Sequence, residues 1–249
     1  MTDQITAANT EEAEYTDKEM TQQLIKVMRR RMGTYSLMAR MYRVEADQKL
    51  LDELSNMRFP ASSENELVAK GYSMIASYMT SIWENTLTEL AVDFVRVFIG
   101  YGMSSKSAAF PYESVYTSEH HLLMQDSRDE VLALYRAAGL EKDPSWPESE
   151  DHIALEFEYI SILTRRSIET LEANDEDAAY KHMMCQWNFL QNHLINWAPA
   201  MAVDMRKFAQ TDFYLGLSYL TEGFLADDVE FLGSLLGVDS QECQEIEEI

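Results

Sequence analysis

Apolar residues recur at intervals of three or four positions along most of the chain. Between Met20 and Tyr42 this spacing is continuous, which places the apolar side chains on one face of an α-helix. Thr16 and Glu19 stand just before that run in the spacing of a capping box, so we expect the helix to begin there. No stretch alternates convincingly between apolar and polar residues, and no internal repeat is evident. The pattern predicts an all-α fold.

The same spacing, read together with capping and stop signals, predicts the remaining elements. In the first half of the chain we expect a helix capped by Ser63 and Glu66, one carrying Trp83 that stops at Gly100, and one capped by Ser127 that ends near Gly139. In the second half we expect helices over 150–172, 175–193 and 212–224. Before the last of these we expect a partly helical segment that is interrupted at Pro199.

The segment "LEKDPSWPESE" carries two prolines and many acidic residues and is the best candidate for a linker. The expected organisation is one helical-bundle-like fold whose two helical halves are joined by this Pro-rich hinge. In chain order we expect a disordered acidic tail over 1–16, the N-terminal half over 17–140, the hinge over 141–150, the C-terminal half over 151–236 and an acidic tail over 237–249.

Composition and charge exclude several classes of function. The chain has 249 residues and a formal net charge of −23. Nucleic-acid binding needs Lys and Arg that replace phosphate counterions, so no nucleic-acid partner is expected. No apolar run is long enough to span a membrane, so stable membrane insertion is not expected, and the N-terminus does not resemble a signal peptide. Cys185 and Cys243 stand in no metal or redox spacing. A cytoplasmic location is the simplest interpretation.

Histidine and acidic residues concentrate in two neighbouring segments, "SEHHLLMQD" and "ESEDHIALE". They raise an alternative from another class, a metal-dependent hydrolase that uses His120, His121, Asp151, His152 and Glu156. No HExxH occurs, and no histidine follows a glutamate by three positions. A structural interpretation is also open, in which Ser149 caps a helix and Asp151 complements the dipole in its first turn. From spacing alone we therefore expect no catalytic residue, no metal and no cofactor.

Four segments stand in a distinctive order along the chain. "DFVRVFIG" ends at Gly100, "PYESVY" covers Pro111–Tyr116, "ESEDH" covers Glu148–His152, and "NHLINWAP" follows later. Taken in this order, they resemble the TorD/DmsD family of cytoplasmic chaperones for molybdoenzymes. The resemblance extends over roughly residues 85–226. Ser149 stands where the family usually has proline, and Phe94 replaces a tryptophan found in some members.

The resemblance implies a chaperone and not an enzyme. Such proteins bind the twin-arginine signal peptide of a molybdopterin-dependent oxidoreductase precursor, and they hold that precursor for cofactor insertion and folding before Tat export. Both the leader and the body of the catalytic-subunit precursor would be partners, and the linker permits a monomer or a domain-swapped dimer. A helical adaptor without leader specificity is a third interpretation.

A twin-arginine leader joins a cationic end to an apolar stretch, so its receptor needs carboxylates beside an apolar groove. Aromatic side chains in such a groove can stack on guanidinium groups. The signal-peptide-binding residues that we expect on these grounds are Asp151, His152, Glu148, Glu150, Phe94, Phe98, Pro111, Tyr112, Ser114 and Tyr116. His152, if near its reference pKa, would make binding sensitive to pH.

Overall fold

The protein is a bundle of helices, as the sequence predicts. The computed structural model describes residues 2–59, 63–100 and 107–238, with side chains described from Lys18 onward. Its elements are α1 (Thr2–Arg43), α2 (Gln48–Asn56), α3 (Glu66–Met79), α4 (Thr86–Phe94), the π-helical turn η1 (Val95–Ile99), α5 (Glu113–Thr117), α6 (Asp126–Ala137), α7 (Ile153–Glu172), α8 (Glu176–Phe189), the π-helical turn η2 (Leu190–Leu194), α9 (Ile195–Phe208) and α10 (Asp212–Leu236). Within those ranges no strand occurs, and no helix is long and apolar enough to cross a membrane.

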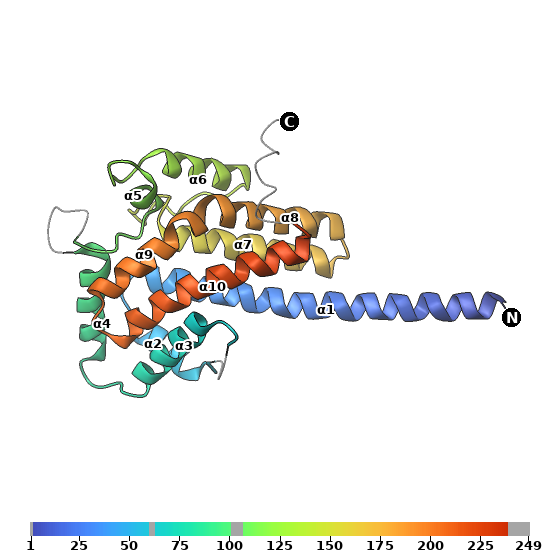
Figure 1. Ribbon diagram of the computed structural model, residues 1–249, viewed down its shortest axis with the longest axis horizontal. Helices are drawn as coiled ribbons and strands as arrows, with labels where there is room; N and C mark the ends of the chain where they lie inside the picture. Colours follow the sequence, from blue (N-terminus) through green and yellow to red (C-terminus); the bar gives the residue numbers. More distant parts are fainter. Residues whose placement is uncertain (1, 60–62, 101–106, 239–249) are drawn as a thin grey trace.

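The long helix α1 runs beside the other helices, and its N-terminal part extends beyond them (Figure 1). α1 packs along α7, α3 packs along α10, and α8 and α9 complete the bundle by packing on α7 and α10 respectively. One continuous apolar core contains residues from both predicted halves. Its largest fully buried side chains include Trp187, Trp197, Tyr35, Tyr42 and Tyr214.

Glycines allow α3 and α10 to approach closely. A Cβ atom added at Gly71 would lie 2.7 Å from the backbone oxygen of Gly216, and one added at Gly216 would lie 2.8 Å from the backbone oxygen of Gly71. Real Cβ contacts essentially never reach such distances. The two backbones therefore touch directly at this crossing.

A buried ion pair joins α1 to α10. Arg31 and Asp228 are almost fully buried, and Nη2 of Arg31 donates to Oδ2 of Asp228 at 2.8 Å. The same carboxylate accepts from the Tyr35 hydroxyl at 2.6 Å, while Nη1 of Arg31 donates to Oε1 of Gln186 at 2.8 Å. Because each charged group has several partners, the desolvation cost of burying the pair is offset.

Several predicted boundaries differ from the structure. α1 begins at Thr2, so it starts before Thr16 and includes residues that were expected to form a tail. Asn65, and not Ser63, caps α3, because its side chain accepts from the backbone N–H of Leu67 at 2.9 Å. Trp83 lies before α4 with 54% of its surface exposed, so the prediction that this helix carries Trp83 was wrong.

The interruption predicted at Pro199 was also wrong. Pro199 lies inside α9, and the departure from α-helical geometry falls earlier, in the π-helical turn η2. There the side-chain amide of Asn196 donates to the backbone oxygens of Gln191 at 3.0 Å and Asn192 at 2.8 Å. A side chain of α9 thus binds backbone carbonyl groups of the irregular turn.

The predicted linker connects α6 to α7 without forming a helix of its own. The C-terminal end of this linker is packed into the protein, because Ser149 and Asp151 are both buried. Its role as a hinge between two halves stays a prediction. Of the acidic tail predicted over 237–249, the part beyond Val238 lies outside the described residues.

Candidate functional site

The two motif segments Pro111–Tyr116 and Glu148–His152 lie against one another. The backbone N–H of Glu113 donates to the Asp151 carbonyl at 3.0 Å, and the N–H of Ile153 donates to the Pro111 carbonyl at 2.9 Å. Tyr112 and His152 form an isolated antiparallel bridge. Segments that are far apart in sequence therefore form one structural unit at the start of α7.

Asp151 lies at the centre of this unit and has no exposed surface. Its Oδ2 accepts from the backbone N–H of Ser114 at 2.9 Å, and its Oδ1 accepts from the Ser149 hydroxyl at 2.5 Å. Asp151 precedes α7, so the interpretation that Ser149 caps a helix with Asp151 in its first turn was wrong. In this conformation the carboxylate holds the loop together and does not reach the surface.

His152 is the N-cap of α7. Its Nδ1 accepts from the backbone N–H of Ala154 at 3.0 Å, and its ring lies edge-on to Tyr112 and Trp146 with centroids 5.0 and 4.9 Å away. Burial, together with the positive charge of Arg43, lowers the pKa of His152 to about 3. The ring stays neutral near pH 7, so the expectation that His152 gives binding a pH sensitivity near its reference pKa was wrong.

The other predicted carboxylates are already partnered within the protein. Glu148 accepts from the Tyr112 hydroxyl, and Glu150 accepts from Nε of Arg128 at 2.7 Å with Lys142 at 3.5 Å. Burial acts to raise the pKa of Glu150, but the hydrogen bond from Arg128, a backbone hydrogen bond and the charges of Lys142 and Arg128 together outweigh it, and the pKa is lowered. A cationic ligand at Glu148 or Glu150 must therefore compete with these contacts.

Phe94 and Phe98 belong to the core and not to the surface of this unit. Their ring centroids lie 5.0 Å apart, and both rings pack against Tyr214 on α10. Both side chains are less than a tenth exposed. Pro111 and Ser114 are buried as well, which leaves Tyr112 and Tyr116 as half-buried aromatic residues of the predicted set.

Next to this unit lies a buried acidic cluster, in which sequence reasoning singled out Glu156 but not the pair of Glu113 and His193. Both carboxylate oxygens of Glu113 lie 3.1 Å from Nδ1 of His193, and Trp197 Nε1 donates to Oε2 of Glu156 at 3.2 Å. Burial raises the pKa of Glu113 and, with the nearby charges of Glu113 and Asp151, raises the pKa of Glu156 well above its usual value. The neutral form of Glu156 is therefore favoured over that of a carboxyl group in water.

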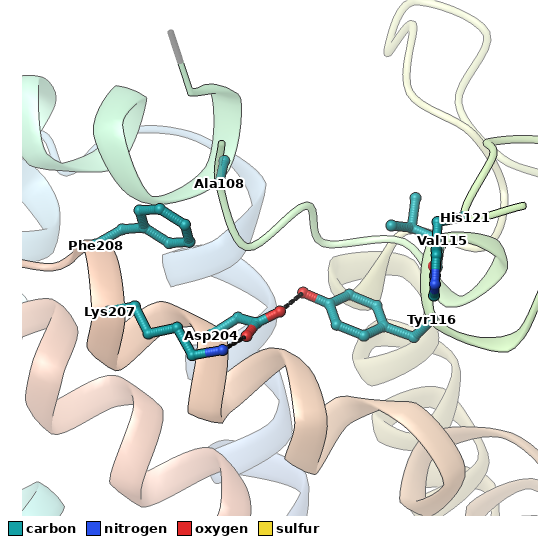
Figure 2. A pocket seen from close by; sticks show the side chains of 7 residues that line it. All are labelled: Ala108, Val115, Tyr116, His121, Asp204, Lys207 and Phe208. Atoms are coloured by element: carbon teal, nitrogen blue, oxygen red, sulfur yellow. Dashed lines mark hydrogen bonds and ion pairs between the residues drawn. The ribbon is translucent and has the colours of Figure 1, made fainter. Parts of the chain in front are cut away.

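Tyr116 borders an open cavity of about 420 Å³ (Figure 2). Its hydroxyl donates to Oδ2 of Asp204 on α9 at 3.4 Å, and Nζ of Lys207 donates to Oδ1 of the same carboxylate at 2.5 Å. The remaining lining residues are Ala108, Val115, His121 and Phe208. Apolar walls and a carboxylate thus meet at one opening, and Asp204 carries no motif that would have singled it out.

The residues proposed for a metal site do not form one. Within the described part of the chain, no group of three or more His, Cys, Asp or Glu side chains is arranged to hold a metal ion. Nδ1 of His121 contacts the Val115 carbonyl oxygen at 2.7 Å, whereas His152 and Glu156 are buried with the contacts described above. The hydrolase alternative gains no support from this geometry.

The sequence profile of the family described as "Nitrate reductase delta subunit" matches residues 63–203. The chain belongs to this family. The match includes both motif segments, the acidic cluster and most of α9, while α1 and α10 lie outside it.

Curated relatives carry the name "Chaperone protein TorD", which confirms the resemblance to the TorD/DmsD family. The protein from Vibrio parahaemolyticus is 31% identical over 144 residues, which are 58% of this chain and 64% of that protein. The one from Photobacterium profundum is 30% identical over 149 residues, 60% of this chain and 66% of that protein. A relative from Shewanella piezotolerans is 23% identical over 216 residues, which cover 82% of this chain and 93% of that protein. The chain thus spans slightly less than two thirds of the first two relatives. Their names denote chaperones and not enzymes.

Proposed function

We propose that the protein is a cytoplasmic chaperone that binds the twin-arginine signal peptide of a molybdopterin-dependent oxidoreductase precursor. It would hold the precursor for cofactor insertion and folding before Tat export. The observation that carries the proposal is family membership, because the matched range contains Pro111–Tyr116 and Glu148–His152 and the relatives are named as TorD chaperones.

The cavity beside Tyr116 suits a peptide that is cationic at one end and apolar after it. Val115 and Phe208 supply apolar surface, and Asp204 supplies a carboxylate. That carboxylate is paired with Lys207, whose side chain is 62% exposed, and exposed pairs of this kind contribute at most about 1 kcal/mol. An arginine can replace Lys207 at little cost, because its guanidinium forms two parallel hydrogen bonds to a carboxylate.

The predicted residues that are buried act on this cavity indirectly, by fixing the segment that carries Tyr116. Asp151 binds the backbone of Ser114, and the segment from Pro111 that it fixes ends at Tyr116, on the edge of the cavity. Burial and the nearby Asp204 carboxylate raise the pKa of Tyr116, so its hydroxyl remains a donor. The formal charge of −23 would attract a cationic leader over a longer range, in a manner that salt weakens.

A pull-down with the full-length protein from its own cytoplasm, at low and moderate salt, tests the proposal. Mass spectrometry should recover a molybdoenzyme precursor with its leader intact. The leader of that precursor, synthesised with its Arg pair and with Lys in place of each Arg, should bind 1:1 and prefer the Arg form. Equal binding of the two peptides would favour an adaptor without leader specificity.

The same peptide tests the cavity. Asp204→Asn should weaken binding about tenfold, as expected for losing a charged hydrogen bond, whereas Lys207→Gln should strengthen it by freeing the carboxylate. Asp177→Asn on α8 is the matched control, because it removes the same charge from an exposed position away from the cavity. If Asp204→Asn and Asp177→Asn behave alike, the leader binds elsewhere.

A further inference from the structure

A second cavity, of about 390 Å³, lies between α6, α7 and the segment formed by α8 and η2. It shares no lining residue with the cavity beside Tyr116. Its volume falls within the range of small-molecule sites, about 300–1,000 Å³. Leu134, Leu163, Tyr159 and Phe189 give it apolar walls, and the last two rings pack edge to face with centroids 4.8 Å apart.

The polar groups of this cavity favour an anion. Arg166 lines it, and so do His182, Asn188, Asn192 and His193, whose Nδ1 already contacts the Glu113 carboxylate. Within the part of the chain that the structure describes, no aspartate or glutamate lines it, although the chain as a whole has a net charge of −23. Burial and the charge of Arg166 lower the pKa of His182, against the opposing charge of Glu169, so Arg166 supplies the positive charge near pH 7.

Arg166 is held in place and keeps donors for a ligand. Its Nη1 donates to the backbone oxygen of Ala138, just after α6, at 3.0 Å. That bond uses one of the five N–H donors of a guanidinium. A fixed guanidinium loses little conformational entropy when it binds a carboxylate, sulfonate or phosphate.

We propose that this cavity binds a small anionic molecule with a flat apolar body. The acidic group would bind Arg166, and the body would lie against Tyr159, Leu163 and Phe189. Asn188 and Asn192, both exposed, would supply amide donors at the rim. This site is independent of leader binding, since the two cavities are lined by different residues.

The test compares two probes that share a ring system and differ in charge. The protein used carries Cys243→Ser, so that Cys185 is its single cysteine. Fluorescence titration of this protein with 1-anilinonaphthalene-8-sulfonate should show tighter binding than titration with the neutral N-phenyl-1-naphthylamine. Arg166→Gln should weaken sulfonate binding about tenfold or more, as for a lost charged hydrogen bond, and leave the neutral probe unchanged. Arg165→Gln is the matched control, because Arg165 is 60% exposed and pairs with Glu169. It should change the sulfonate affinity less than twofold.

Cys185 reports whether the probe occupies this cavity. It is an exposed free cysteine that lines the cavity, so saturating sulfonate should slow its alkylation by neutral iodoacetamide. Because Arg166 also holds the end of α6, a second variant, Ala137→Trp, keeps the arginine and fills the opening from an exposed lining position. It should abolish sulfonate binding. Unchanged sulfonate binding in Ala137→Trp, or unprotected Cys185 at saturation, would overturn the proposal.

Discussion

The carboxylate of Asp151 accepts a hydrogen bond from the backbone N–H of Ser114 at 2.9 Å, across 37 positions of sequence. This bond connects two of the motif segments on which the family resemblance rests. Ser149 donates to the other carboxylate oxygen, and Asp151 has no exposed surface. The acidic residue of the "ESEDH" motif therefore fixes the loop that carries Tyr116, and its effect on a ligand is indirect.

Asp151→Ala should lower the free energy of unfolding by about 2–3 kcal/mol, because the substitution leaves a buried N–H without its charged partner. Asp151→Asn should cost less, since it keeps an acceptor oxygen and removes a charge that raises the pKa of Glu156. Urea denaturation at pH 7 measures both values. Asp177→Ala, an exposed aspartate, should change stability by less than about 0.5 kcal/mol. Equal effects of Asp151→Ala and Asp177→Ala would show that the Asp151 bond contributes nothing.

His152 should remain neutral across the physiological pH range. Its pKa is lowered to about 3 from 6.5, so its contribution to stability is complete above pH 6.5 and is lost as the pH falls from 6.5 towards 3. NMR of ring-labelled protein should show no titration of His152 between pH 5 and 8, while histidine added to the sample titrates normally. A midpoint near 6.5 for His152 would contradict its burial.

The capping role of His152 gives a second measurable result. His152→Ala removes the N-cap acceptor of α7 and the ring between Tyr112 and Trp146, which together should cost about 2 kcal/mol. His152→Asn should retain part of this, because asparagine is a strong N-cap residue. Denaturant unfolding at pH 7 compares them, and equal losses would argue against the cap.

Glu156 should make the protein less stable as the pH rises. Burial, with the charges of Glu113 and Asp151, raises its folded-state pKa well above 4.5. The stability that its neutral form contributes is therefore present below pH 4.5 and is lost as the pH rises towards the folded-state pKa. Glu156→Gln removes this titration and can still accept from Trp197, so it should be more stable than the wild type at pH 8. It should also show a smaller loss of stability as the pH rises from 4.5 to 8.

Glu158→Gln is the control for the Glu156 prediction, because it makes the same change two residues along α7 at a side chain that is 46% exposed. Its pH profile should follow that of the wild type. If the Glu156→Gln and wild-type profiles coincide, Glu156 is ionised in the folded protein.

The helical fold could be predicted from sequence because amphipathic spacing is a local property. Boundaries were harder, since Asn65 and Ser63 are both acceptable caps and tertiary contacts decide between them. The side-chain amide of Asn65 also donates a hydrogen bond to the backbone oxygen of Gly223 on α10 at 3.1 Å, which favours Asn65 as the cap. Arg31 shows the same limit: within "RRRMG" nothing distinguishes the arginine that is buried against Asp228.

The candidate site could be predicted only in part, because tertiary contacts decide which of its residues are buried. The motifs identify Asp151, His152 and Tyr116, but spacing cannot reveal that the first two are buried and the third borders a cavity. Phe94 and Phe98 share a helix face, and only the packing of α10 shows that both rings are in the core. Asp204 belongs to a helix whose local sequence is unremarkable, so only the folded chain places it beside Tyr116.

Two glycine substitutions should have opposite effects on stability. Gly71→Ala places a Cβ atom 2.7 Å from backbone atoms of Gly216 and Leu220, so α3 and α10 must separate. The lost packing should cost about 1–3 kcal/mol, as overpacking of a core does. At Gly33, inside α1, a Cβ atom meets nothing within 4 Å, so Gly33→Ala should stabilise the protein by about 0.5–1 kcal/mol through its helix propensity. Thermal and urea unfolding of the two variants measures the difference. Changes of the same sign would show that helix propensity, and not the close crossing of α3 and α10, governs both positions.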